Sequence, residues 1–439
     1  MYVKFWGTRG SIPTPLASHT IEQKIRQALI GAAGLDLSDE TVIDRYIERL
    51  PFIDKHTTGG DTACVEVRSG DQLLIIDAGS GIRLLGLELM QQGYAQGNRQ
   101  MDLLVTHTHW DHIQGLPFFL PLYREGSILA FHSIRRGDDA LRSVIEGQMV
   151  NPYFPVDSGA MTAKRAFFDL DYGNININGA LITSAPLNHP QGCAGFRVRA
   201  DGCTLVYATD NEPGSPEHDR SIRDLARDAD LLIYDAQYTP VQLRNGKGGW
   251  GHSSWLEGAR IANECGVRRL ILFHHDPDRD DESVDNLVRD AREVFPQVVG
   301  AAEGMEISLP EQETILSQEF SVLRHEPRYH IEVPALVTWH DERGERREAH
   351  AIAQNVSKSG IYFVSGDNIP AARYVDVELV FPPDVTQRGP MKVHFAAHPI
   401  RQQKAEPSED GNTDNVGIAA LRISSEVPPE PVLRFHTVA

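Results

Sequence analysis

The stretch THTHWDH, residues 106–112, is the most informative part of this 439-residue chain. It begins at the last residue of the run Leu103–Thr106, which predicts a buried strand that ends just before His107. His107 and His109 alternate, so in an extended segment both imidazoles point to the same side and can bind one ion. The turn that follows can aim Asp111 and His112 at a second site close by. The pattern therefore predicts a centre for two metal ions.

Other short apolar runs along the chain also end at polar residues. They are Leu73–Ile76 before Asp77, Leu181–Pro186 before His189, Thr204–Ala208 before Asp210, Leu231–Tyr234 before Asp235, and Leu270–Phe273 before His274. Helical patterns lie between the runs, most clearly at Trp255–Cys265 and Glu282–Phe295. Alternating strands and helices predict a layered α/β architecture whose strand ends gather along one edge of a sheet.

These strand ends supply the other candidate ligands. His189 would complete a three-histidine site with His107 and His109, and Asp210 could bridge both ions through its two oxygens. Imidazole and carboxylate ligands suit zinc, and without a thiolate they also admit manganese or iron.

The second ion needs one more ligand besides Asp111 and His112. His274 and His275 are both candidates, and His274 is favoured because it comes first after its strand. Asp77 is interpreted as a supporting residue that hydrogen-bonds to a ligand histidine or to the loop backbone.

The composition limits the classes of partner. The formal net charge is −19, from 61 acidic and 42 basic side chains, which argues against binding duplex DNA or an anionic membrane surface. No apolar run approaches the ~20 residues of a membrane span, and the first residues do not resemble a secretion signal. The four cysteines are too scattered for a disulfide framework. We expect a cytoplasmic protein without membrane insertion, and a homodimer stays open.

The HxHxDH run, the DAGSG stretch from Asp77, and the later His189, Asp210 and His274 resemble the metallo-β-lactamase superfamily. The resemblance covers residues 1–310. It implies an αββα sandwich, of α+β or α/β class, with a two-metal hydrolytic site at the sheet edge. Thioester and lactam hydrolases of this fold use similar ligands, so the bond that is cleaved stays open at this point.

Two further motifs resemble the phosphodiesterase branch near ribonuclease Z: FWGTRGSIP at residues 5–13 and GWGHSS at residues 249–254. That branch pairs a carboxylate with a histidine as proton donor, which by motif position would be Asp235 and His252. The catalytic residues would then be these two and Asp111, which orients the attacking water. Arg9 is expected either near an anion or paired with a local carboxylate. Since the chain is acidic, we expect a small phosphodiester substrate, a cyclic nucleotide or a short RNA.

The helical spacing of Ile21–Leu50 predicts an insertion over residues 15–57, either a packed surface helix pair or a lid over the site. Residues 311–319 are a predicted linker. Beyond them the helical periodicity ends and strands are expected in residues 320–439. These are Ile331–Thr338, Ala349–Val356, Gly360–Ser365, Tyr374–Phe381, Lys392–Ile400 and Val416–Ile423. Such spacing predicts a small antiparallel β-barrel.

The sequence RHEPR, residues 324–328, is followed by NVSKSG, residues 355–360. Arg324 and Arg328 can present two guanidinium groups to phosphates and stack on purines. Together with Asn355, Ser357 and Gly360 they resemble the PilZ domain, a bacterial receptor for cyclic-di-GMP. The resemblance implies that cyclic-di-GMP regulates the hydrolase. The alternative is a non-catalytic cyclic-di-GMP receptor that serves as an adaptor.

Overall fold

The computed structural model describes residues 1–94, 100–134, 141–310, 329–340, 345–356, 360–367, 369, 375–381, 391–404 and 416–423. The chain divides into two compact units, Met1–Ser321 and Val322–Ala439.

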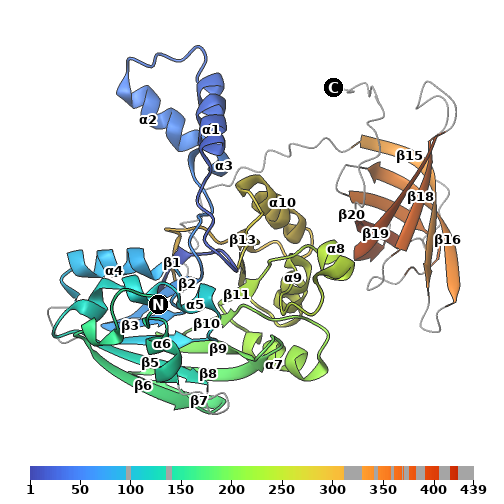
Figure 1. Cartoon of the computed structure of the whole chain (residues 1–439). Helices are drawn as coiled ribbons and strands as arrows, with labels where there is room; N and C mark the ends of the chain where they lie inside the picture. The colour runs from blue at the N-terminus through green and yellow to red at the C-terminus, as the bar shows by residue number, and fades with distance from the viewer. Residues whose placement is uncertain are drawn as a thin grey trace. The chain divides into compact units, whose positions relative to one another are not determined.

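The described residues of the first unit form two seven-stranded sheets (Figure 1). In the first sheet the order is β14-β1-β2-β3-β4-β5-β6, antiparallel from β14 to β3 and parallel from β3 to β6. The strands are β1 Tyr2–Gly7, β2 Cys64–Ser69, β3 Gln72–Ile76, β4 Gln100–Val105, β5 Ile128–Ile134, β6 Lys164–Leu170 and β14 Glu306–Ser308.

In the second sheet the order is β13-β12-β11-β10-β9-β8-β7, parallel from β13 to β10 and antiparallel from β10 to β7. The strands are β7 Gly173–Ile177, β8 Ala180–Leu187, β9 Cys193–Ala200, β10 Cys203–Ala208, β11 Leu231–Asp235, β12 Arg269–Phe273 and β13 Val298–Gly300. The predicted strands that precede the candidate ligands all form, with bounds within three residues of those expected.

One core lies between the two sheets, because side chains alternate along each strand. Leu74 and Ile76 of β3 pack in a cluster with Phe196 and Phe273 of the second sheet. Leu73, one position earlier, belongs to a separate cluster on the outer face of the first sheet. Each fully buried side chain of this size contributes about 1.5–3 kcal/mol.

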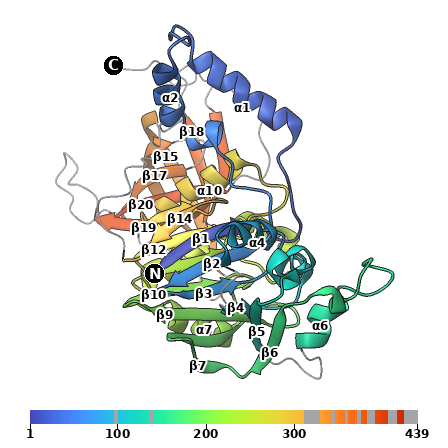
Figure 2. The ribbon, with the colours of Figure 1, turned by 90° about the vertical axis from the view of Figure 1, so that its left-hand side faces the viewer.

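Helices cover the outer face of each sheet (Figures 1 and 2). α4 Ile82–Gln91 packs on the first sheet, while α7 Pro216–Ala226, α9 Trp255–Glu264 and α10 Asp281–Arg292 pack on the second. Shorter helices in the connections are α5 Trp110–Ile113, α6 Leu141–Gly147, α8 Pro240–Gln242, η2 Leu116–Phe118, η3 Leu120–Tyr123, η4 Ser158–Ala160 and η5 Leu243–Lys247. This arrangement confirms the αββα expectation.

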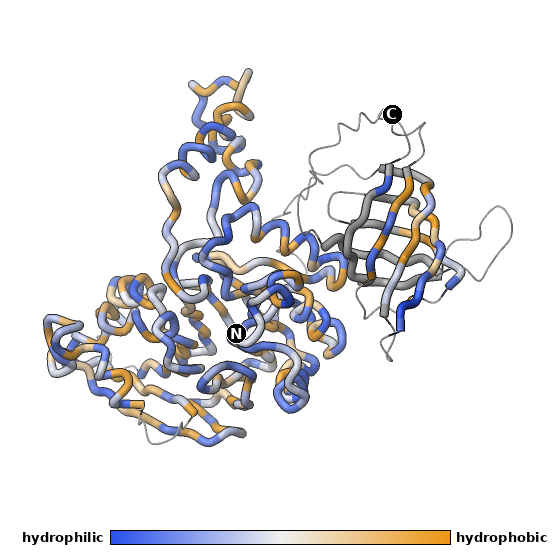
Figure 3. Tube along the Cα trace, turned by 45° about the vertical axis from the view of Figure 1, so that its right-hand side comes forward, coloured by the Kyte–Doolittle hydropathy of each residue, from blue (hydrophilic) through white to orange (hydrophobic). Residues whose placement is uncertain are grey.

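The segment 15–57 contains α1 Ser18–Gly31, α2 Glu40–Arg49 and α3 Phe52–Lys55. No residue of these helices is buried, and hydrophobic positions recur along the segment (Figure 3). The exposed ones are Ile21, Ile25, Leu29, Ile30 and Ile47. Tyr46 of α2 donates to the carbonyl oxygen of Ala28 on α1 at 2.5 Å, and Lys24 lies 2.9 Å from the Asp281 carboxylate of α10. The two helices thus contact each other and are tied to the layers by an ion pair, without packing an apolar face on them.

In the second unit, six described strands close into an antiparallel barrel in the order β15-β16-β17-β20-β19-β18. They are β15 Tyr329–His340, β16 Arg346–Val356, β17 Gly360–Ser365, β18 Val375–Phe381, β19 Met391–Lys404 and β20 Val416–Ile423. Alternate residues such as Val333, Ala335 and Val337 are buried in its interior. No helix in the described parts of the chain is long and apolar enough to span a bilayer.

Candidate metal centre

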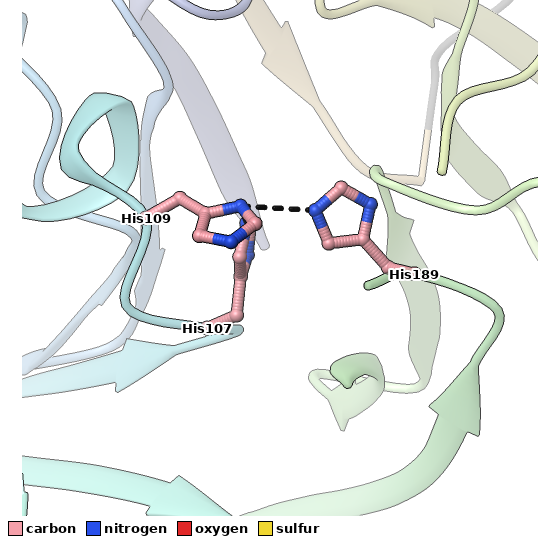
Figure 4. Close-up of side chains that lie close together, drawn as sticks. All are labelled: His107, His109 and His189. Atoms are coloured by element: carbon pink, nitrogen blue, oxygen red, sulfur yellow. Dashed lines mark hydrogen bonds between the residues drawn. The ribbon is translucent and has the colours of Figure 1, made fainter. Parts of the chain in front are cut away.

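Three imidazoles meet where strand ends of the two sheets come together. His107 and His109 follow β4 of the first sheet, and His189 follows β8 of the second. Nε2 of His107 and Nε2 of His189 each lie 3.0 Å from Nδ1 of His109 (Figure 4). Ligand nitrogens around a tetrahedral zinc ion are about 3.3 Å apart, because each Zn–N bond is ~2.0–2.1 Å long. The three side chains therefore form a group of the size that a zinc ion requires.

The outward nitrogens of this group have partners of their own. His189 Nδ1 donates to the carbonyl oxygen of Gly251 at 2.8 Å, and His109 Nε2 lies 3.2 Å from the side-chain oxygen of Gln191. Burial lowers the pKa of His107 and of His189, so both rings are neutral. With their protons on the outward nitrogens, the inward nitrogens present lone pairs to one another, an arrangement that a cation between them stabilises.

Asp111, His112 and His274 form a second group. Oδ2 of Asp111 lies 3.4 Å from Nε2 of His112 and 3.2 Å from Nε2 of His274. Nδ1 of His274 faces the side-chain oxygen of Gln237 at 3.2 Å, which leaves Nε2 for the group. All three side chains are buried.

Asp210 lies between the two groups, with one oxygen toward each. Its Oδ1 is 3.9 Å from Nε2 of His107 and 3.8 Å from Nε2 of His189. Its Oδ2 is 3.2 Å from Nε2 of His112 and 3.6 Å from Nε2 of His274. Burial alone would raise the pKa of Asp210, but the surrounding imidazoles outweigh burial and hold it well below its ordinary value. The carboxylate is therefore charged and placed to serve both groups.

Two atoms of this cluster are orphaned. Nε2 of His112 and Oδ2 of Asp210 are buried and make no hydrogen bond to the described part of the chain. Burial alone would lower the pKa of His112, but the Asp111, Asp210 and Asp77 carboxylates outweigh it and raise it well above its ordinary value. A buried polar atom normally has a hydrogen-bonding or metal partner, and three carboxylates around one imidazole stabilise positive charge at this place. The donor set therefore fits divalent cations.

Backbone strain marks three of the residues that follow strands. Asp77, Asp210 and His274 have φ angles of 60°, 59° and 59°. This left-handed conformation costs a residue other than glycine about 1–3 kcal/mol and is concentrated at functional sites. His275, the next residue, directs Nε2 at the carbonyl oxygen of Ala301, 3.0 Å away, and burial lowers its pKa to about 3. The structure thus brings His274, and not His275, into the cluster.

Asp77 supports the second group through hydrogen bonds. Its Oδ2 accepts from Nδ1 of His112 at 2.8 Å and from the Tyr207 hydroxyl at 3.1 Å. Its Oδ1 accepts from the backbone N–H of Thr106 at 2.8 Å. A carboxylate behind a ligand histidine fixes the tautomer and the orientation of the ring. Asp77 thus contacts both a candidate ligand histidine and the loop that carries the others.

The N-terminal motif shapes the second group through its backbone. The N–H of Ser11 donates to Oδ2 of Asp111 at 2.8 Å. A Cβ at Gly10 would lie 2.6 Å from the His274 ring, so only glycine fits there.

Arg9 does not form the expected pair with a local carboxylate, since no carboxylate among the described residues lies within ion-pair distance of its guanidinium. The guanidinium is buried and donates to three carbonyl oxygens, those of Gly59 at 2.8 Å, Asp276 at 3.2 Å and Arg279 at 2.6 Å. Arg9 therefore ties the loops around the site together.

The glycine-rich stretch 248–251 supports the first group. Gly251 has φ of 85°, and a Cβ there would lie 2.2 Å from Nδ1 of His189. The Glu212 carboxylate accepts from the backbone N–H groups of Gly249 and Gly251, each at 2.8 Å. This carboxylate therefore fixes the loop that carries the Gly251 carbonyl to His189.

His252 and Asp235 form a pair next to the second group. Nδ1 of His252 lies 3.0 Å from Oδ2 of Asp235, which also accepts from the backbone N–H of Asp210 at 3.0 Å. Burial alone would lower the pKa of His252, but Asp235, followed by the other nearby carboxylates, outweighs it and raises the pKa to about 9. His252 is therefore protonated near neutral pH and can donate a proton from Nε2.

A cavity of about 470 Å³ borders the three-histidine group. His107, His109 and Gln191 line it on the side of the cluster, and Leu141 and Val144 of α6 add apolar surface. Its volume falls within the range of sites that hold small ligands, roughly 300–1,000 Å³.

Of the predicted cyclic-di-GMP residues, Arg324, Arg328 and Ser357 lie outside the described residues. The backbone of Asn355 belongs to β16 and pairs with Tyr362, and Gly360 begins β17 and pairs with Leu421.

The chain matches one protein family and is similar to several known proteins. Residues 73–275 match the family described as "Beta-lactamase superfamily domain". The chain is 25% identical over 300 residues to ribonuclease Z of Haloarcula marismortui, covering 57% of this chain and 92% of the relative. It is 24% identical over 302 residues to ribonuclease Z of Methanosarcina acetivorans, covering 58% and 94%. The crystal structure of human tRNase Z, short form, is 19% identical with a TM-score of 0.46, and the similarity covers 71% of this chain and 100% of that one.

The sandwich, the His/Asp cluster and the family match together define the class of protein. Residues 73–275 of the first unit match the beta-lactamase superfamily, and the protein is a metal-dependent hydrolase. Within that superfamily, its sequence is ribonuclease Z-like.

Proposed function

We propose that the first unit is a phosphodiesterase that binds two metal ions. One ion would be held by His107, His109 and His189, the other by Asp111, His112 and His274, with Asp210 shared. The observation that carries the proposal is the position of Asp210. Its Oδ1 faces the imidazole nitrogens of His107 and His189, and its Oδ2 faces those of His112 and His274. Zinc suits this donor set best, and manganese or iron would also be accepted.

Divalent cations at these ligands would supply Lewis-acid stabilisation of a phosphodiester oxygen and activation of water. The protein's own contribution is orientation and proton transfer. Asp111 accepts from the Ser11 N–H, which keeps its Oδ2 directed at Nε2 of His274, and it would orient the attacking water. His252, held by Asp235, would deliver its Nε2 proton to the departing alkoxide, a step usually worth 10²–10⁴-fold in rate.

The substrate class rests on similarity and on charge. The full-length relatives are named ribonuclease Z, which supports a phosphodiester rather than a thioester or lactam. The net charge of −19 disfavours large polyanions, so we propose a small phosphodiester such as a cyclic nucleotide or a short RNA. Residues 234–237 read Tyr-Asp-Ala-Gln where ribonuclease Z usually has His-Glu-Ala-Thr, a difference next to the proposed proton donor.

A substrate panel tests this function. Methyl p-nitrophenyl phosphate, a thioester and a β-lactam would be compared with zinc-loaded protein, and hydrolysis of the phosphodiester alone is expected. Asp111→Ala should reduce the rate at least 10²-fold. The matched control Asp71→Ala changes an exposed turn at the other end of β3 from Asp77 and should leave the rate unchanged. Hydrolysis of only the thioester or the lactam would overturn the proposal.

We also propose that the second unit is a PilZ-like receptor through which cyclic-di-GMP regulates the hydrolase. The support is the pattern of Arg324, Arg328, Asn355, Ser357 and Gly360 in a chain segment that forms an antiparallel barrel. Calorimetry with cyclic-di-GMP should show binding that Arg324→Ala abolishes, and phosphodiester hydrolysis should change when the nucleotide is added. Binding with unchanged kinetics would exclude regulation, and absence of binding would exclude the receptor.

A further inference from the structure

Two large aromatic side chains beside the metal centre are exposed. Trp110 is 77% exposed and Trp250 is 58% exposed, although indole rings are usually mostly buried in folded proteins. Trp110 stands between the candidate ligands His109 and Asp111 in the chain. Trp250 directly precedes Gly251, whose carbonyl oxygen accepts from His189. Both exposed rings are therefore carried by segments that hold the metal centre.

These two segments come from different sheets. The loop with Trp110 follows β4 of the first sheet, and the loop with Trp250 follows β11 of the second. Both segments contact His189: Nδ1 of His109 lies 3.0 Å from its Nε2, and the carbonyl oxygen of Gly251 accepts from its Nδ1 at 2.8 Å. Each of the two loops that contact His189 therefore carries one exposed indole.

The segment that carries Trp250 is also fixed. The Glu212 carboxylate holds the backbone N–H groups on either side of Trp250, those of Gly249 and Gly251. Nζ of Lys247 lies 4.6 Å from the centroid of the Trp250 ring, a cation–π contact that helps orient the indole. A ring held in place loses little entropy when a ligand stacks on it.

We propose that Trp110 and Trp250 are stacking platforms for the two nucleobases that flank the scissile phosphodiester. The inference rests on the proposed phosphodiesterase function and narrows its substrate to a linear single-stranded oligonucleotide, with a base on each side of the bond. A cyclic mononucleotide has one base and can use only one platform. Base stacking on an aromatic side chain is worth about 1–3 kcal/mol, and it stabilises every base because each has a π-face. Lys247 adds positive charge for a neighbouring phosphate on an otherwise acidic chain.

The test compares adenylyl-adenosine with an analogue that keeps the sugars and the phosphodiester but lacks both bases. The wild-type protein should have a kcat/KM ratio for these two substrates of at least 20. Trp110→Ala and Trp250→Ala should each lower this ratio 5-fold or more, since 1 kcal/mol is a factor of about 5. Trp110→Phe and Trp250→Phe, which keep an aromatic ring, should lower the ratio less. Tyr153→Ala removes another aromatic ring, 81% exposed, and should leave the ratio unchanged.

Binding gives a second measurement that does not depend on turnover. Adenosine 5′-monophosphate should quench the tryptophan fluorescence of the metal-loaded protein, and ribose 5-phosphate, which lacks the base, should not. Either Trp→Phe variant should lose part of this quenching. A ratio near 1 in the wild type, or a ratio that both alanine variants leave unchanged, would overturn the stacking proposal. A protein that hydrolyses methyl p-nitrophenyl phosphate but not adenylyl-adenosine would overturn the stacking proposal alone, whereas a protein that hydrolyses none of these phosphodiesters would overturn the proposed phosphodiesterase function.

Discussion

Replacing Asp77 by asparagine should weaken metal binding at the second group of ligands. Asp77 is not itself a proposed ligand, and the effect would come from a change in the position of the proton on His112. In the wild type, the Asp77 carboxylate accepts from Nδ1–H of His112 at 2.8 Å, which leaves Nε2 as the nitrogen that can give up its proton and bind a cation. The amide of Asp77→Asn keeps one oxygen for the Thr106 N–H and presents an NH₂ group toward His112. His112 then has to accept at Nδ1 and carry its proton on Nε2, the atom that faces Asp111 and Asp210.

The size of the effect follows from the role of such supporting carboxylates. Loss of a hydrogen-bonding partner behind a ligand histidine typically costs 10–100-fold in metal affinity, which is about 1.4–2.7 kcal/mol. Zinc affinity would be measured by competition with a chromophoric chelator, for both binding steps, in wild type and variant. We expect Asp77→Asn to weaken one step 10–100-fold and the other much less, with kcat reduced at least as strongly.

Tyr207→Phe is the matched control. It removes a hydrogen bond to the same Asp77 oxygen without changing the His112 tautomer. The cost should be about 1 kcal/mol of stability, with zinc affinity within 3-fold of wild type. The reasoning is refuted if Asp77→Asn binds two zinc ions as tightly as the wild type, or if Tyr207→Phe weakens zinc binding as much as Asp77→Asn does.

Three further predictions address other parts of the site. His252→Asn should slow hydrolysis of a dialkyl phosphodiester 10²–10⁴-fold but hydrolysis of a p-nitrophenyl phosphodiester less than 10-fold, because p-nitrophenolate leaves without a proton. Equal losses of rate for the two substrates would exclude His252 as the proton donor. Gly251→Ala should weaken zinc binding whereas Gly249→Ala should not, since both residues have φ of 85° but only a Cβ at Gly251 meets His189. Equal zinc affinities of the two variants in chelator competition would contradict this prediction. Burial raises the pKa of Glu303 to about 7, so the native state keeps a proton that the unfolded chain releases near pH 4.5. The stability that this proton contributes is fully present below pH 4.5 and is lost as the pH rises through 7. Glu303→Gln should therefore be more stable than wild type by ~3 kcal/mol at pH 8 in urea unfolding, with a smaller difference at pH 5, and a pH-independent difference would be evidence against this pKa.

The strand ends were predictable because apolar runs and the polar residues after them are local features of the sequence. β3, β10 and β12 form where such runs occur, and each delivers one of Asp77, Asp210 and His274. Several expected strands of the barrel also correspond to observed ones, with Gly360–Ser365 and Val416–Ile423 at the expected bounds.

The remaining features depend on contacts between distant residues. Gln191, Gln237 and Glu212 act on His109, His274 and the glycine-rich loop, and no local pattern marks them as functional residues. The choice between His274 and His275 depends on the left-handed turn at His274. Arg9 has a motif that suggests ligand binding, but its partners are three carbonyl oxygens and the Thr58 hydroxyl, all far away in the chain.

The central claim is that Asp210 joins two adjacent cation sites. Elemental analysis of the purified, dialysed protein tests it most directly, together with a matched Asp210→Ala sample. We expect two equivalents of divalent transition metal per chain in the wild type, and fewer than one tightly held equivalent in the variant. A wild-type protein that reaches full turnover with one equivalent or less would contradict it.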